Sequence, residues 1–292
     1  MFFEEWPLLT FSLLSQTAAG MFFLLALLRS LLPPAASPAR LDGIRAGIAA
    51  VGPLLGLAML LSFFHLGSPT GALAASPNPD SWMVREVLAT SLFLGLWGVC
   101  FLLSRKNRLN AGLQWVTAFA GMAAVFFMAG AYTHSIRPAW IHLNTYLTFF
   151  GATLILGAPP AVLAFATKTR ETMDSAKALR FLVVVAGAAV LLPLLYQPVF
   201  FSSLKAGEAA AQVSAQLYAG NFLPMVVLRW FLSIAGLAAL TYGVYVQALR
   251  RQPIRTNFLY WAAGLVFVGE GLGRYLFFAT AVSSQIGFLN LK

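Results

Sequence analysis

The chain has 292 residues, of which 60% are hydrophobic and only 10% are charged, and its formal net charge is +10. Its mean hydropathy is +0.80. Soluble domains are roughly half apolar and about a quarter charged, so this composition excludes an ordinary soluble protein and indicates an integral membrane protein. Apolar runs of about 20 residues without strict alternation predict membrane-spanning helices rather than the strands of a barrel.

Eight apolar runs are each long enough to cross a hydrocarbon core of about 30 Å at about 1.5 Å of helical rise per residue. These runs are Leu8–Leu32, Ile44–Phe64, Met83–Leu103, Gln114–Tyr132, Tyr146–Ala166, Leu179–Val199, Pro224–Leu249 and Phe258–Ala281. The connections between them are too short to hold a soluble domain. Residues 1–292 are therefore predicted to form one all-α domain, a bundle of eight transmembrane helices.

The lysine and arginine residues predict the orientation of this bundle. Their counts in the seven connections, with the span ends included, are 3, 1, 3, 1, 4, 1 and 3. The positive-inside rule places the odd-numbered connections in the cytoplasm, so both termini are expected on the outer side. The acidic N-terminus, with Glu4 and Glu5, lacks the basic segment of a cleavable signal peptide, and the first run should remain as a helix.

The cysteine and histidine residues limit the cofactors that this protein can hold. A single cysteine, Cys100, excludes an internal disulfide and a four-thiolate metal or iron–sulfur site. The three histidines, His65, His134 and His142, fall near the outer face and do not provide two facing axial ligands for a haem inside the bundle. We expect no metal, haem or iron–sulfur cluster in this protein, so electrons from any redox substrate must leave through a partner subunit.

Polar residues concentrate in the outer half of the predicted bundle, whereas the inner half has almost none. They are Gln16, His65, Arg85, Glu86, Arg229, Glu270 and Arg274. The helical rise places Arg229 about 8 Å, Arg274 about 10 Å and Gln16 about 12 Å from the outer ends of their spans. Ionisable residues at membrane depth are rare and commonly functional.

Structural roles can also explain these residues. Glu270 and Arg274 are four residues apart on one helical face and could neutralise each other. Arg229 could pair with Glu86 from another span. Arg85 could extend to the outer interface. A histidine at position 65 could cap the end of the second span, where a cation is favourable.

The functional interpretation is oxidation of a quinol at the outer face. This reaction releases two electrons and two protons, and it needs proton acceptors beside an apolar cleft that the isoprenoid tail can enter. Histidine accepts protons near neutral pH, and a partly buried carboxylate can do so as well. His65 and Glu86, on either side of the connection between the second and third spans, are the predicted quinol-binding and proton-accepting residues. The supporting residues around them would be Arg85, Arg229, Glu270, Arg274 and Gln16.

Several short motifs of the sequence resemble the membrane-anchor subunit of anaerobic dimethyl sulfoxide reductase. They are Glu5-Trp6-Pro7-Leu8 with Gln16 and Gly20, His65-Leu66-Gly67-Ser68-Pro69, Ser81-Trp82 with Arg85-Glu86, Arg229-Trp230, and Gly269-Glu270-Gly271-Leu272-Gly273-Arg274. The similarity extends over essentially the whole chain, with the same eight spans and both ends outside. In that family the residues that match His65 and Glu86 are associated with the quinol site.

The resemblance implies a heterotrimer in the bacterial inner membrane. A catalytic subunit would carry a molybdopterin-bound molybdenum centre, and an electron-transfer subunit would carry [4Fe–4S] clusters. This anchor would oxidise menaquinol and pass the electrons to the nearest cluster in anaerobic respiration. The terminal substrate would be set by the catalytic subunit, so dimethyl sulfoxide, trimethylamine N-oxide and an oxyanion remain open, as does the direction of electron flow.

Two other functions remain open from the sequence. A proton-coupled transporter could use Glu270 and Arg274 as its coupling pair. Such transporters commonly show inverted repeats and broken midplane helices, and neither is clear here. A passive anchor would hold a soluble enzyme at the membrane without contacting quinol. Substitution of His65 and Glu86 would leave quinol-linked turnover intact in that case.

Overall fold

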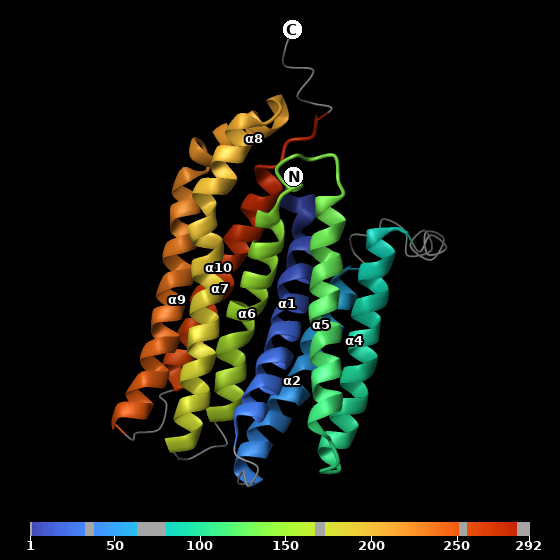
Figure 1. Ribbon diagram of the computed structural model, residues 1–292, viewed down its shortest axis with the longest axis vertical. Helices are drawn as coiled ribbons and strands as arrows, with labels where there is room; N and C mark the ends of the chain where they lie inside the picture. Colours follow the sequence, from blue (N-terminus) through green and yellow to red (C-terminus); the bar gives the residue numbers. More distant parts are fainter. Residues whose placement is uncertain (1, 33–37, 63–79, 167–172, 251–255, 285–292) are drawn as a thin grey trace.

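The computed structural model describes residues 2–32, 38–62, 80–166, 173–250 and 256–284. Within these ranges the protein is entirely helical apart from turns and short connections (Figure 1). The helices are α1 (Phe2–Leu31), α2 (Pro38–Ser62), α4 (Trp82–Arg105), α5 (Ala111–Thr133), α6 (Leu143–Ala166), α7 (Met173–Ala206), α8 (Ala209–Ala219), α9 (Leu223–Arg250) and α10 (Thr256–Ala279). The predicted all-α class is confirmed.

Eight of these helices are long and apolar enough to cross a membrane, and they correspond one to one to the eight predicted spans. The short helix α8 is the exception. It lies within the connection Phe200 to Leu223, where run length predicts a loop, and α7 also continues to Ala206. The alanine-rich segment of α8 is too short to span a membrane, so run length gave no signal for it.

The helices divide into central and peripheral ones. In the most apolar part of each span, 72% of α1 residues and 67% of α6 residues are buried, against 28% in both α4 and α9. Figure 1 shows the same arrangement, with α1 and α6 in the middle and α4 and α9 at opposite sides. The exposed large side chains of the peripheral helices are apolar, as expected where lipid is the solvent.

Small residues allow the two central helices to approach closely. A Cβ atom at Gly20 of α1 would collide with the backbone carbonyl of Thr153 in α6, and one at Gly157 of α6 would collide with the backbone at Gly20. Close contact at small residues is a usual way to associate helices in lipid, where the hydrophobic effect does not drive packing. Pro159 and Pro160 lie within α6 without interrupting it.

The end of the bundle where α1 begins and α10 ends is called the upper end here, as it is drawn in Figure 1. The connection between α5 and α6, residues 134–142, lies at this end, and so do α8 and the start of α4. The sequence predicts that the upper end is the outer face of the membrane. The buried charged residues of α9 and α10 are close to this end.

Candidate functional site

Two glycines of α10 bring its charged residues against α9. A Cβ atom at Gly269 would approach the backbone nitrogen of Ser233 to 3.0 Å and the carbonyl oxygen of Arg229 to 3.1 Å. One turn later, a Cβ at Gly273 would collide with Nε of Arg229. Gly269 and Gly273, four residues apart, therefore form a surface of α10 without side chains. The Arg229 side chain of α9 packs on this surface beside Glu270.

The Arg229–Glu270 ion pair is buried between these two helices. Nη2 of Arg229 lies 3.4 Å from Oε2 of Glu270, and the two side chains are 8% and 6% exposed. The hydroxyl of Ser233 donates a hydrogen bond of 2.8 Å to the other carboxylate oxygen. The guanidinium also lies 4.3 Å from the ring centre of Trp230. The possible pairing of Arg229 with Glu86 is wrong, because Glu270 takes that place.

Arg274, one turn from Glu270 on α10, connects α10 to the central helices. Its Nη2 donates a hydrogen bond of 2.7 Å to Oε1 of Gln16 in α1. Gln16 in turn donates from Nε2 to the carbonyl oxygen of Phe149 in α6, at 3.3 Å. The Arg274 guanidinium lies 3.7 Å from the ring centre of Phe149. Four of the predicted supporting residues thus form two contacting pairs, although Glu270 hydrogen-bonds to α9 rather than to Arg274.

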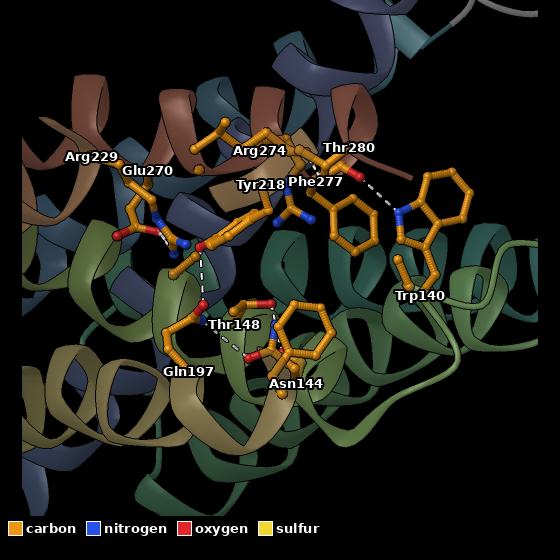
Figure 2. A pocket seen from close by; sticks show the side chains of 15 residues that line it. Trp140, Asn144, Thr148, Gln197, Tyr218, Arg229, Glu270, Arg274, Phe277 and Thr280 are labelled. Atoms are coloured by element: carbon orange, nitrogen blue, oxygen red, sulfur yellow. Dashed lines mark hydrogen bonds and ion pairs between the residues drawn. The ribbon is translucent and has the colours of Figure 1, made fainter. Parts of the chain in front are cut away.

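A cavity opens beside these residues, and we call it the upper cavity (Figure 2). Its volume is about 50 Å³. Residues of α6 to α10 and of the α5–α6 connection line it: Ala139, Trp140, Asn144, Thr148, Ala152, Gln197, Phe200, Tyr218, Arg229, Glu270, Gly273, Arg274, Leu276, Phe277 and Thr280.

Neutral polar side chains form a hydrogen-bonded row across the cavity, from Tyr218 beside Arg229 to Asn144 of α6 (Figure 2). The hydroxyl of Tyr218 donates to Oε1 of Gln197 at 3.0 Å, and Nε2 of Gln197 donates to Oδ1 of Asn144 at 3.4 Å. Burial raises the pKa of Tyr218 above its usual value, so this phenol stays protonated near neutral pH. Sequence reasoning missed these three residues because it searched for ionisable groups, and because run length predicts a loop where α8 carries Tyr218.

Glu86 lies on the other side of the bundle, in the second turn of α4. The start of this helix is fixed by Trp82, whose indole fills the space above Gly130 and stacks on His134 with 4.3 Å between ring centres. Arg85 forms an ion pair of 3.2 Å with Asp80, consistent with the expected extension toward the interface. Glu86 itself is half-buried.

Of the predicted histidines, His65 and His142 differ in whether the structure describes their surroundings. His65 lies outside the described residues, so its meeting with Glu86 stays a prediction. His142 lies at the upper end, where Nε2 is 2.9 Å from the hydroxyl of Ser203 and Nδ1 accepts a hydrogen bond from the backbone N–H of Asn144. Burial lowers the pKa of His142, which favours the neutral ring.

The lower half of the bundle is more polar than the sequence indicated. Nη1 of Arg29 donates to Oε1 of Gln114 at 3.0 Å, and Nη2 donates to the carbonyl oxygen of Leu109 at 2.7 Å. Cys100 contacts the hydroxyl of Thr117 at 3.1 Å. These contacts join the lower ends of α1, α4 and α5. Among the described residues, no group of three histidine, cysteine, aspartate or glutamate side chains could hold a metal ion.

Comparisons with known proteins point to one family. The family model "DMSO reductase anchor subunit (DmsC)" matches residues 1–280. The C subunit of anaerobic dimethyl sulfoxide reductase from Escherichia coli (strain K12) is 30% identical over 162 residues, which cover 53% of this protein and 55% of that relative. The anaerobic dimethyl sulfoxide reductase subunit YnfH of the same organism is 27% identical over 290 residues, which cover 94% of each protein. No solved structure matches.

Proposed function

Because the chain belongs to the family of DMSO reductase membrane anchor subunits, we propose that it oxidises a quinol at the upper end of the bundle. The electrons would pass to an iron–sulfur subunit of a molybdenum oxidoreductase. The protein is a multi-pass protein of the bacterial inner membrane. The observation that carries the proposal is the placement of Glu86, a half-buried carboxylate, in the second turn of α4 at the upper end of the bundle.

The proposed chemistry is the loss of two protons and two electrons from one quinol. His65 would accept one hydroxyl proton and Glu86 the other, and both protons would leave on the outer side. The supporting roles of Arg85 and Gln16 would be indirect. Arg85 is paired with Asp80, and Gln16 holds Arg274 in place.

The quinol ring could bind either in the upper cavity or beside Glu86 on α4, and the small size of the cavity favours the position beside Glu86. A benzene ring binds in an engineered cavity of about 150 Å³. The upper cavity, at about 50 Å³, is therefore too small for a quinol ring. The ring would instead approach Glu86 along α4, where the apolar side chains of Met83 and Val87, which lie beside Glu86 on the helix surface, are exposed to lipid. Menaquinol, an apolar quinol of the membrane, suits this approach.

Partner subunits would supply the redox centres. Because the chain belongs to the family of DMSO reductase membrane anchor subunits, electrons from the quinol would pass to an acceptor in a partner subunit. We propose an electron-transfer subunit with [4Fe–4S] clusters at the upper end, and a molybdopterin subunit that reduces the terminal substrate. The three subunits would form a heterotrimer.

The test compares turnover driven by a menaquinol analogue with turnover driven by a reduced dye, in the assembled complex. His65→Ala and Glu86→Gln should lower quinol-linked turnover by about 100-fold, the usual scale for loss of a general base, and leave dye-linked turnover unchanged. Glu208→Gln is the matched control, because Glu208 is an exposed carboxylate at the same end of the bundle. Unchanged quinol-linked turnover in both variants would leave a passive anchor or a transporter.

A further inference from the structure

The upper cavity carries an excess of buried positive charge. Two guanidinium groups and one carboxylate line it, and Arg229, Arg274 and Glu270 are 7%, 5% and 6% exposed. Glu86, on α4, does not line the cavity. An uncompensated charge in a low-dielectric interior is costly, so the cavity favours a negatively charged occupant.

Two buried hydrogen-bond donors in the cavity wall have no partner. They are the Nε atoms of Arg229 and Arg274. Leaving such a donor unsatisfied costs about 1–3 kcal/mol, and more for a charged group. Other donors of these guanidiniums are engaged. Nη2 of Arg229 pairs with Glu270, and Tyr218 also contacts Arg229. Nη2 of Arg274 donates to Gln16. Figure 2 shows the two arginine side chains directed to the same hollow, from neighbouring positions on α9 and α10.

We propose that the upper cavity binds a small monovalent anion of the halide type. The two guanidiniums and one carboxylate in the wall leave one positive charge unbalanced, which favours an anion with a single negative charge. The volume of about 50 Å³ sets the size, because it corresponds to roughly three to five water molecules at about 10–15 Å³ each. The anion would accept from the free arginine donors. The aromatic edges of Phe277 and Trp140 would close the site, because ring edges carry partial positive charge.

Other occupants fit less well. A phosphate or other divalent anion would reverse the net charge and would be repelled by Glu270. A metal cation is excluded by the two arginines. Water alone satisfies the Nε donors but leaves the surplus charge in place. A bound anion would join α9 and α10 electrostatically to the cavity wall of α6, α7 and α8, and so hold the second half of the bundle together.

The direct test is anomalous scattering from crystals of the complete complex, purified in gluconate and then transferred to bromide. We expect one bromide peak between Arg229 and Arg274. The proposal would be overturned if the side chains around the cavity were ordered and the cavity gave no bromide peak, or held only water. This measurement does not involve turnover, so it is separate from the test of quinol oxidation, and Glu86→Gln should keep the peak.

A second measurement follows halide binding in solution by the bromide-dependent rise in Tm of the complex. Arg274→Gln should weaken bromide binding at least tenfold. Ala152→Leu, which keeps every charge but fills the cavity wall, should do the same. Lys205→Gln is the control, because Lys205 is an exposed cation at the upper end outside the cavity. Equal bromide dependence in the wild type and in Ala152→Leu would contradict the site even if Arg274→Gln does not assemble.

Discussion

The α9–α10 interface and the start of α4 carry similar residue types in different physical settings. In the interface, Arg229 and Glu270 are 8% and 6% exposed, and Ser233 also holds the carboxylate. At α4, the ion pair of Arg85 with Asp80 is 37% and 91% exposed. Glu86, one residue further, is half-buried. Charges that are buried and held by several partners are costly to leave unpaired, whereas a half-buried carboxylate at a membrane face is suited to exchanging protons.

The difference predicts a large loss of stability when the buried pair is broken. Glu270→Ala leaves Arg229 in the interior without its ion-pair partner, and the cost of an uncompensated buried charge is about 3–5 kcal/mol. Thermal unfolding of the purified complex should show a marked fall in Tm. The double variant Arg229→Met with Glu270→Met should recover most of it, because no buried charge is left. A Tm for Glu270→Ala within error of the wild type would show that Arg229 is not left as an uncompensated buried charge.

A smaller effect separates two glycines on the same helix. Gly273→Ala places a Cβ against Nε of Arg229, so the guanidinium must move and the α9–α10 contact loosens. Overpacking of this kind costs about 1–3 kcal/mol. Gly271→Ala is the matched control, because its Cβ would meet only Cδ1 of Leu13 at an ordinary 3.7 Å. Tm values should fall for Gly273→Ala alone, and equal values for the two variants would contradict the packing assigned to Gly273.

The smallest effect concerns pH at the upper end. Because burial lowers the pKa of His142, the unfolded protein binds a proton there more readily than the folded protein does. Stability should therefore decrease as the pH falls below the usual histidine pKa of about 6.5, until the folded pKa is passed. His142→Gln should reduce the slope of Tm against pH between about 7 and 5. An unchanged slope would mean that His142 does not contribute to the pH dependence.

The fold followed from the sequence because run length and composition determine what can cross a membrane. The partner of Glu270 did not follow, because the rotation of α10 against α9 depends on how Gly269 and Gly273 fit a neighbouring backbone. Helical spacing alone favoured Arg274, which lies on the same helix. Spacing along one helix identifies possible neighbours, and packing between helices selects among them.

The upper cavity could not be predicted for a related reason. Its polar wall combines Asn144 from α6, Gln197 from α7 and Tyr218 from α8, which are far apart in the sequence. Each is neutral and common, so none stands out in the sequence. The sequence also gives no signal that Trp82 packs on Gly130 and His134, although this packing fixes the helix that carries Glu86.

The central claim is that quinol binds beside Glu86 and His65, and the most direct test is the binding of a fluorescent quinol-site inhibitor to membranes that contain the complete complex. We predict stoichiometric binding to the wild type, loss of binding in His65→Ala and in Glu86→Gln, and unchanged binding in Ala152→Leu, which fills the upper cavity. The claim would be contradicted if a well-assembled wild-type complex bound no inhibitor, or if Ala152→Leu abolished binding while Glu86→Gln did not.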